Sequence, residues 1–280
     1  MKRPFLGLVL AISALIPAFA GGGSAVAQSL NFSQKNGAPV EVYADNGIEW
    51  QQENLTFIAR GNARAVRGEV TIFADELRAY YREKPSGDTE IHRLDAIGNV
   101  RIRSKDATSS SGRAIYNVDD GILVLDVGRI KMVAGSDTIY ADEQLEYWER
   151  KNMAVARGNA SARRGDKRLR ADVLAAHFRK NKAGDTEIYR VDAFDDVKIV
   201  TQKDTALSER GVYNVKSGIA TLTGSVRILR GRNTLNGCSA EVNLNTGVSR
   251  LHSCAAPSGR GKKRVRGVIL PSTVKNKVGG

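Results

Sequence analysis

The sequence predicts an all-β protein built from tandem copies of one strand-rich unit. The first observation is a duplication at a spacing of 97 residues: YADNGIEWQQENLTFIARGNARA starts at Tyr43, and YADEQLEYWERKNMAVARGNASA starts at Tyr140. The second is a series of short runs in which apolar and polar residues alternate, which directs one face of a strand toward a dry interior. The third is the turn residues that separate these runs every 8 to 12 positions. Many short, evenly spaced strands are typical of a sandwich, a barrel or a solenoid-like roll.

The duplication continues without a gap for more than 80 residues, and a third, partial copy begins near Asn236. Gly61-Asn62 corresponds to Gly158-Asn159, for example, and Tyr116-Asn117 corresponds to Tyr213-Asn214. No segment has a convincing amphipathic helical pattern. A unit with one apolar face cannot bury that face alone, so the stacked copies are expected to share one continuous apolar interior. The predicted strands include residues 69–73, 99–103, 129–133, 197–200 and 225–229.

The N-terminus predicts a secretory signal peptide over residues 1–27. Lys2 and Arg3 give it a positively charged start, and an apolar run follows over residues 5–19. Two small-x-small cleavage sites come next, and we favour the second, which ends at Ala27. The alternative is an uncleaved membrane anchor. No later segment approaches the roughly 20 apolar residues that a membrane-spanning helix needs, so we expect an exported, soluble mature chain.

The charge is unevenly distributed. The chain has a formal net charge of +13, and residues 255–280 hold seven basic residues and no acidic ones, which predicts a basic tail. Basic proteins often bind nucleic acid, but export argues against that partner and favours anionic lipid headgroups or phosphorylated sugars. Two interpretations of the tail stay open: a flexible, solvated segment, or a contact with lipid phosphates or an anionic membrane surface. The run Val268-Ile269-Leu270 also leaves open an added edge strand.

Positions that are apolar in both copies identify the candidate interior, because the residues between them are largely charged or hydroxylated. The pattern fits two interpretations, a packed core and a cavity that opens to an acyl chain. The candidate lining residues are Ile48, Trp50, Ile58, Ile72, Leu77, Tyr81, Val100, Ile102, Ile115, Leu125, Leu145, Tyr147, Val155, Leu169, Phe178, Val197, Ile199, Val212 and Leu222.

The polar residues do not predict an enzyme. Ala-Asp pairs recur at equivalent places, as at Asp75 and Asp172, which favours a turn or strand-edge role in which the carboxylate bonds nearby backbone N–H groups. His92 corresponds to Tyr189, and His177 to Tyr80, so these histidine positions accept aromatic bulk. We find no nucleophile elbow, phosphate loop or metal-ligand cluster. We therefore expect no catalytic residue, no metal and no cofactor.

The two cysteines, Cys238 and Cys254, are equidistant from Thr246 in an Asn-Thr-Gly turn. A hairpin that closes at this turn would place them opposite one another, at a spacing that a disulfide can bridge with some adjustment. Paired cysteines are also usual in an oxidising compartment. The sequence therefore predicts a cross-strand disulfide in the last hairpin, with two free thiols as the alternative.

Several short motifs keep a fixed order behind the signal peptide: Ala44-Asp45, Gly61-Asn62-Ala63, Gly68-x-Val70-x-Ile72-x-Ala74-Asp75-x-Leu77, Gly98-Asn99-Val100 and Leu222-Thr223-Gly224. In this order and spacing they resemble the OstA/LptA family of periplasmic lipopolysaccharide transport proteins, from about Val40 to Ser253. The resemblance implies an elongated, twisted β-jellyroll of about sixteen antiparallel strands over residues 38–254. It also implies a hydrophobic interior that shields the acyl chains of lipopolysaccharide between the inner and outer membranes.

The resemblance further implies the partners: inner-membrane and outer-membrane components of the transport machinery at opposite ends, and a head-to-tail homo-oligomer. Residues 38–43 would lie at one exposed end, and the hairpin around residues 245–247 toward the other. The cysteine pair and the basic tail are not part of the family pattern. The main alternative is an envelope scaffold with a fully packed interior that binds other proteins and no lipid. The soluble part of an outer-membrane translocon and a β-solenoid enzyme are disfavoured.

Overall fold

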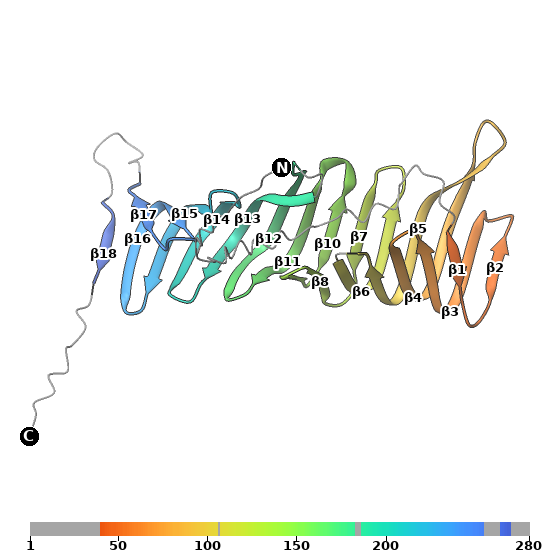
Figure 1. Ribbon diagram of the computed structural model, residues 1–280, viewed down its shortest axis with the longest axis horizontal. Helices are drawn as coiled ribbons and strands as arrows, with labels where there is room; N and C mark the ends of the chain where they lie inside the picture. Colours follow the sequence, from red (N-terminus) through yellow and green to blue (C-terminus); the bar gives the residue numbers. More distant parts are fainter. Residues whose placement is uncertain (1–39, 106, 183–185, 255–263, 270–280) are drawn as a thin grey trace, which may run out of the picture.

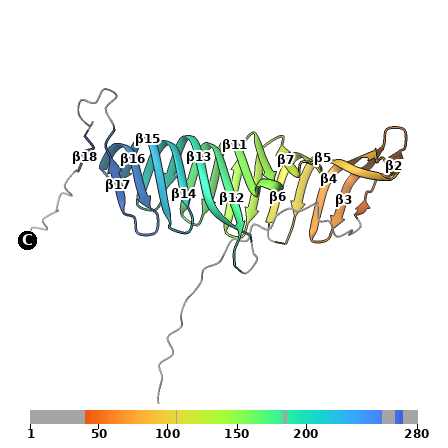
Figure 2. The same cartoon turned by 90° about the horizontal axis from the view of Figure 1, so that it is seen from above.

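The computed structural model describes residues 40–105, 107–182, 186–254 and 264–269. In these residues the chain forms one sheet of 18 strands, which lie side by side across the long axis of an elongated body (Figures 1 and 2). The other regular element in these ranges is the short 3-10 helix η1 (Glu149–Lys151). The prediction of an all-β, elongated β-jellyroll is therefore confirmed, with 18 strands in place of about sixteen. The predicted signal peptide lies outside the described residues, as does the tail except for residues 264–269.

The strand lengths repeat as the duplication predicts. Strands β3 to β6 have 12, 14, 15 and 11 residues, and β11 to β14 have the same four lengths. The strands are β1 (Glu41–Tyr43), β2 (Ile48–Gln51), β3 (Thr56–Arg67), β4 (Val70–Glu83), β5 (Thr89–Arg103), β6 (Ala107–Asn117), β7 (Ile122–Asp126), β8 (Ile130–Ala134), β9 (Asp137–Ala141), β10 (Gln144–Trp148), β11 (Met153–Arg164), β12 (Lys167–Lys180), β13 (Thr186–Val200), β14 (Asp204–Asn214), β15 (Ile219–Arg230), β16 (Asn233–Asn243), β17 (Ser249–His252) and β18 (Arg266–Val268).

The sheet is an antiparallel meander that advances along the long axis. In places two consecutive short strands together take the position of one long strand, and we call each long strand, or each such pair, a rung. Thus β1 and β2 both pair with β3, β7 and β8 with β6, and β9 and β10 with β11. At the far end, β17 and β18 both pair with β16. The β1–β2 and β17–β18 rungs therefore lie at opposite ends of the body (Figure 1). The edge strand left open for the tail forms at Arg266–Val268, and Leu270 lies outside the described residues.

Each long rung bends at one place, which we call the corner. In β5 the pairing with β4 shifts around Gly98 and Asn99, whose φ angles are +78° and +46°. Gly158 and Asn159 in β11 repeat this pair of left-handed residues, at +76° and +46°. Glycine is required here because a Cβ at Gly98 would overlap the carboxylate of Asp75. Such bulges bend a strand sharply, so every rung is folded into two arms.

The two sets of arms form two walls that meet at the corner and face each other across the interior. Inward residues of both walls belong to one core cluster. At the free edges, the Arg230 guanidinium of one wall donates a hydrogen bond of 2.8 Å to the Gly247 carbonyl of the other. Wall A comprises residues 41–43, 63–74, 100–111, 130–141, 160–171, 197–208, 226–237 and 266–268. Wall B comprises residues 48–60, 76–97, 113–126, 144–157, 173–194, 210–223 and 239–252.

Beside the corner, the inward residues of wall B form a continuous lateral row in which small residues are interspersed with leucines. Directly opposed residues on antiparallel strands share a face, so the strand pairing traces the row from β3 to β16. The short side chains leave room for the leucines to interdigitate at the density of a protein interior. The row is Ala59, Leu77, Ala96, Ala114, Leu125, Leu145, Ala156, Leu174, Ala193, Gly211, Leu222 and Ala240.

The Ala-Asp pairs lie at the corner, in the strand-edge role that their recurrence predicts. In three of the four pairs the carboxylate accepts a hydrogen bond from the asparagine side chain of the next rung, in place of the expected bond from a backbone N–H group. These three pairs tie adjacent rungs together where the strands bend. The bonds join Asn62 to Asp45 (2.8 Å), Asn99 to Asp75 (2.9 Å) and Asn159 to Asp142 (3.2 Å).

Two substitutions at one corner should separate backbone strain from hydrogen bonding. Asp75→Ala removes only the bond from Asn99 and is expected to lower the free energy of unfolding by about 1 kcal/mol. Asn99→Ala removes the same bond and also places alanine at φ +46°, which adds about 1 kcal/mol. Urea unfolding of both variants measures the difference. Equal effects would show that asparagine is not needed there for its backbone conformation.

Candidate functional site

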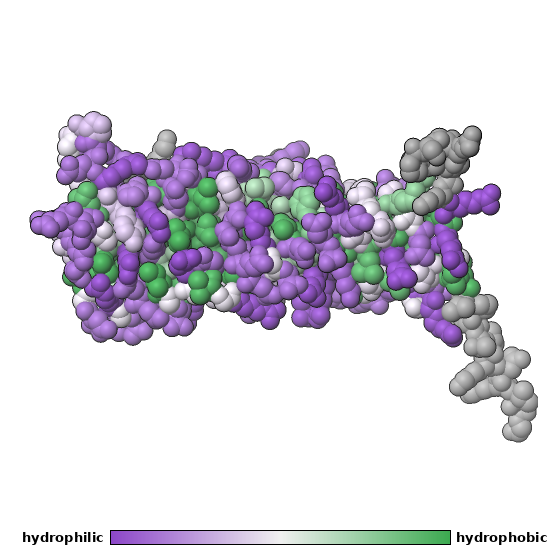
Figure 3. Space-filling view, turned by 180° about the vertical axis from the view of Figure 1, so that it is seen from behind, coloured by the Kyte–Doolittle hydropathy of each residue, from purple (hydrophilic) through white to green (hydrophobic). Residues whose placement is uncertain are grey.

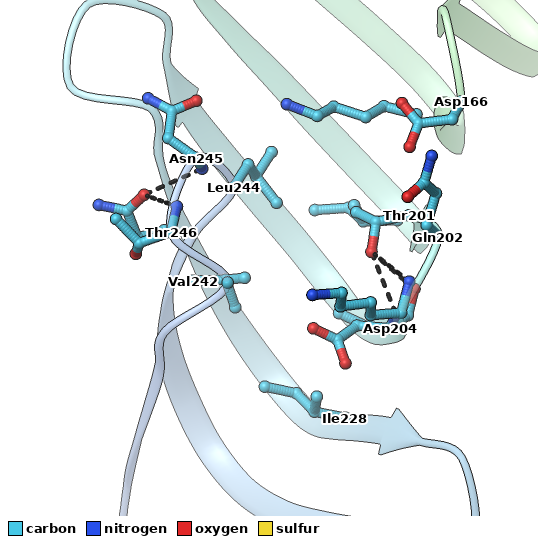
Figure 4. Close-up of a pocket in the computed structure, with 15 residues that line it drawn as sticks. Asp166, Thr201, Gln202, Asp204, Ile228, Val242, Leu244, Asn245 and Thr246 are labelled. Carbon is cyan, nitrogen blue, oxygen red and sulfur yellow. Dashed lines mark hydrogen bonds between the residues drawn. The ribbon is translucent and has the colours of Figure 1, made fainter.

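The interior opens at a hollow of about 220 Å³ between the free edges of the two walls, near the β17–β18 end. On wall A it is bordered by the turns around residues 166–167 and 201–204, and on wall B by residues 243–247 (Figure 4). We call this opening the mouth. It lies beside the contact between Arg230 and Gly247 that joins the two edges.

The mouth has an apolar floor and a polar rim. Ile228 and Val242 are 3% and 5% exposed and form part of the floor, and Figure 4 shows them below Leu244. The rim carries charged side chains that include Lys167 and Lys203. Such an arrangement accepts a molecule with an apolar part inside and a polar part in water.

Short polar contacts hold the turns of the rim in shape. The Thr201 hydroxyl accepts a hydrogen bond from the Asp204 amide at 3.1 Å, and the Asn243 side chain accepts one from the Thr246 amide at 3.0 Å (Figure 4). Asp204 also pairs with Arg230 at 2.5 Å. The rim is therefore built from ordered turns.

Beyond the mouth the interior is tightly packed. A second, smaller hollow of about 10 Å³ shares Ile199 with the mouth and continues toward Gly211 and Leu222. Leu222 is fully buried, and Val100 and Ile102 are each 1% exposed. A space-filling view shows apolar side chains in patches along one face, with hydrophilic side chains between and around them (Figure 3). The inward residues form one core cluster, so the apolar interior is continuous, and the two walls would have to part to admit a chain along it.

Burial raises the pKa of the phenol groups of Tyr81 and Tyr213, with the nearby Arg164 opposing the shift at Tyr213. Because the neutral phenol is favoured in the folded state, its contribution to stability is present below about pH 10 and is lost as the pH rises through the higher folded pKa. Tyr213→Phe is therefore expected to unfold less readily than the wild type above about pH 10. Urea midpoints between pH 8 and 11 measure this, with Tyr140→Phe on the outer face of wall A as the control. An identical pH dependence in all three proteins would contradict it.

Strand register places fifteen of the nineteen candidate lining residues on inward positions. Eleven belong to the core cluster, and Leu169 packs against it. Tyr81 lies opposite Ile91 at the place that Phe178 takes in the second copy. Ile48 and Trp50 oppose Ala59 and Phe57 on the inward side of the last rung, but are 48% and 68% exposed. The eleven are Ile72, Leu77, Val100, Ile102, Leu125, Leu145, Tyr147, Phe178, Val197, Ile199 and Leu222.

Four candidate lining residues lie on the outer face of wall B, which corrects the prediction for them. Ile58 and Val155 are buried, but they oppose Arg78 and Glu146 and lie outside the core cluster. The residues opposite them on the neighbouring strands have long charged side chains, whose apolar stems can pack on a buried aliphatic side chain. The other two are Ile115 and Val212, which oppose Asp95 and Asp192; Val212 is 37% exposed.

The residues that point inward in place of Ile115 and Val212 are Tyr116 and Tyr213. Tyr116 is 3% exposed in the core cluster, and Tyr213 packs against the cluster. Counting in steps of two along the strand from Ala114 would have identified Tyr116 as an inward residue. Ile115 and Val212 were chosen instead because their side chains are aliphatic.

The predicted disulfide between Cys238 and Cys254 is present, with a Cα–Cα distance of 5.0 Å. Its predicted register is wrong by one residue, because Asn243 pairs with Val248 and Ser239 opposes His252. The turn is therefore centred half a residue before Thr246. The bridge joins adjacent rungs at the corner, at the place that Asp and Asn side chains take elsewhere.

The ionisable side chains that cluster in the described residues form contacts within the sheet. His177 lies 2.9 Å from Asp192 on the outer face of wall B, where Arg190 binds the same carboxylate. No group of three or more His, Cys, Asp or Glu side chains in the described ranges could hold a metal ion. Within the same ranges, no helix has the length and apolar character that crossing a membrane requires.

Comparison with known proteins gives a family match and likenesses to individual proteins. A family described as "LptA/(LptD N-terminal domain) LPS transport protein" matches residues 41–144 and 138–248. An uncharacterized protein of Rhizobium meliloti (strain 1021) is 24% identical over 117 residues, which cover 40% of this chain and 63% of the relative, so less than two thirds of that relative is matched. Pseudomonas aeruginosa LptH, described as the LptA-homologous periplasmic component of the lipopolysaccharide transport device, aligns with 11% identity and a TM-score of 0.21, over 84% of this chain and 96% of LptH.

Proposed function

Because the chain belongs to the family of LptA and the LptD N-terminal domain, a family of lipopolysaccharide transport proteins, we propose that it carries lipopolysaccharide across the periplasm. In this proposal residues 1–27 direct export and are removed near Ala27. The mature chain binds the acyl chains between its two walls and leaves the sugars in water. The observation that carries the proposal is the continuous apolar interior with its polar-rimmed mouth.

The energetics favour such a carrier. Burying one CH₂ group is worth about 0.8 kcal/mol, so a 14-carbon acyl chain resists transfer to water by roughly 10 kcal/mol. A carrier must replace water along most of each chain. The inward row from Ala59 to Ala240 supplies aliphatic contact along the long axis. Charged sugars need no such shielding and can remain outside the mouth.

The ends of the body suit docking by strand addition. Tyr43, Ile48 and Trp50 are exposed apolar residues on the β1–β2 rung, and the β17–β18 rung ends the sheet on the other side. Edge strands offer backbone groups that can pair with another chain. We propose that membrane components of the transport machinery, and further copies of this chain, add to these two ends so that the interior continues between subunits.

Site-specific photocrosslinking tests the proposal. A benzophenone amino acid is placed at Leu244 on the lip of the mouth, at Leu169 in the interior, and at Leu229 on the outer face as the matched control. After ultraviolet irradiation with lipopolysaccharide, crosslinks are expected at the first two positions and not at the third. Crosslinks at all three positions, or at none in a folded protein, would contradict an interior binding site.

A second candidate function is an envelope scaffold that binds proteins and no lipid. The tight packing favours it, because the second hollow measures only about 10 Å³. The two candidates differ in one observable. A carrier must part its walls at their free edges, so lipopolysaccharide should increase hydrogen exchange of the backbone amides near the mouth. A scaffold should show no response to the lipid.

A further inference from the structure

The outer faces of the two walls carry charge in different ways. On wall B, basic side chains are joined to carboxylates: Arg93 to Asp95 at 2.7 Å and Arg157 to Glu146 at 2.7 Å, for example. On wall A, from β4 to β18, the outward positions of the described residues carry no carboxylate. The acidic residues within these arms, such as Asp137, lie on the inward side at the free edge.

Four cations on neighbouring strands of wall A form what we call the basic quartet: Arg163, Arg168, Arg170 and Lys198. Arg163 lies directly opposite Arg168, and Arg170 directly opposite Lys198. All four are exposed, and none forms an ion pair within the described ranges. Arg163 donates to the Gly165 carbonyl and Arg170 to the Asn159 amide oxygen, which are neutral acceptors.

The quartet does not stabilise the fold. Like charges placed directly opposite one another across a β-ladder are destabilising, and here two such pairs lie side by side. The nearest carboxylates along the chain are Asp166, in the turn at the rim of the mouth, and Asp172 and Asp196, at the corner beyond the quartet. An arrangement that weakens the sheet but concentrates positive charge is suited to an anionic partner.

The quartet is continuous with the mouth. Lys167 belongs to the rim, and the next residue, Arg168, points to the outer face because side chains alternate along a strand. Lys203 adds a second cation to the rim, in the turn that follows β13, the strand of Lys198. A polar group that leaves the mouth therefore meets Lys167 and Lys203 among the carboxylates of the rim, and then the quartet over the edge of wall A, where the outward positions carry no carboxylate.

The shape of the wall indicates which anion fits. Strand pairing places Arg170 and Lys198 in an outward row that also holds Arg64, Arg101, Lys131, Arg227 and Arg266. Neighbouring strands are rotated by about 20 to 25° relative to each other, so this band of cations winds around the long axis. A flat bilayer could touch only a part of it, whereas a flexible chain can follow it. We propose that the basic quartet binds the phosphate-bearing saccharide of the glycolipid whose acyl chains fill the interior. This inference rests on the proposed function.

The test uses the full mature protein and a lipid-free probe, the phosphorylated oligosaccharide that complete deacylation of lipopolysaccharide releases. Fluorescence anisotropy of the labelled probe is compared for wild type and for the variant with all four quartet residues changed to Gln. The variant is expected to bind at least about tenfold more weakly, with a smaller dependence on salt. Its melting temperature should equal or exceed that of the wild type, because repulsion is removed.

The matched control changes Lys180, Lys182, Lys216 and Arg250 to Gln, which removes the same charge from positions outside wall A. It should bind the oligosaccharide within about twofold of wild type. Equal losses of affinity in both variants would show that only the net charge of the protein matters, and would overturn the proposal. Binding of wild type to phosphatidylglycerol vesicles but not to the oligosaccharide would also overturn it, because the surface would then be a membrane-binding one.

Displacement of a fluorescent acyl probe from the interior separates this inference from the proposed function. The quartet variant should bind that probe as wild type does. If wild type binds the acyl probe but not the oligosaccharide, the proposal that the quartet binds saccharide is wrong and the carrier function stands. If wild type binds the oligosaccharide through the quartet but never the acyl probe, the carrier function is wrong and the anion-binding surface stands.

Discussion

Replacing Ile228 with lysine is expected to lower the affinity for an acyl chain about 100-fold. Ile228 lies on the floor of the mouth and is 3% exposed. A lysine there can extend its stem along the floor and reach the rim with its ammonium group, where it would occupy the path of the chain. Loss of contact with about four CH₂ groups corresponds to about 3 kcal/mol, or about two powers of ten in affinity. Competition between a fluorescent fatty-acyl probe and lipopolysaccharide measures the change.

The matched control is Leu229→Lys on the same strand. Leu229 follows Ile228 and points to the outer face, opposite Thr205 and Thr234, so this variant should bind the probe as wild type does. If Ile228→Lys fails to fold, Leu244→Lys at the half-buried lip provides the same obstruction with less burial. Wild-type affinity in a folded Ile228→Lys protein would show that acyl chains do not pass through the mouth.

The sequence predicted the strands well because side chains alternate between the two faces of a strand, and both copies of the duplicated unit show this alternation. The second copy repeats the first so closely that the four long strands of each have the same lengths. The extra strands arise where one rung is interrupted at the corner, as between β7 and β8, at Val127 and Gly128 with φ +63° and +75°. A break of this kind leaves the apolar pattern on either side intact, so the pattern does not reveal it.

The inward face was harder to predict than the strands. The two copies share the same phase, so comparing them shows which positions stay apolar but not on which side these positions lie. Ile58 and Val155 are equivalent positions that stay apolar in both copies, yet they lie on the outer face, where Arg78 and Glu146 oppose them. At a corner the phase is kept in β3, where Ala59 and Ala63 both face inward, but it shifts by one residue in β4, where Ala74 and Leu77 both face inward. Counting by two across Asp75 therefore leads to the wrong face.

The mouth and the basic quartet were not predictable from local sequence. The mouth joins turns that lie 35 or more residues apart, at 166, 201–204 and 243–247. The opposition of Arg163 to Arg168 and of Arg170 to Lys198 depends on the register of three strands. Composition showed a basic chain but placed the excess in the tail. The charge that the fold concentrates on wall A became visible only when the strands were paired.

Removing the disulfide is expected to lower the free energy of unfolding of the last rungs by about 3 kcal/mol. The bridge closes a loop with a sequence separation of 16 residues, for which loss of chain entropy predicts this magnitude. The four-residue strand β17 and the three-residue strand β18 have few other contacts to hold them on β16. In a repeat architecture the effect should stay near the end. Hydrogen exchange of Cys238→Ser/Cys254→Ser should therefore rise in β16 to β18 and remain unchanged from β3 to β6.

A second double variant tests why the bridge lies at the corner. At three other corners an Asp carboxylate accepts a hydrogen bond from the Asn of the next rung, and Cys238 and Cys254 hold the corresponding places. Cys238→Asp/Cys254→Asn should therefore recover about 1 kcal/mol of the stability lost in the serine variant. Recovery would identify the disulfide as a covalent form of the same corner contact. A protein no more stable than the serine variant would show that the last corner differs in geometry from the others. A further subunit would pair with the edge that the last rung provides. Comparing the assembly of the two double variants therefore also shows how far subunit pairing depends on the bond that holds this rung at the corner.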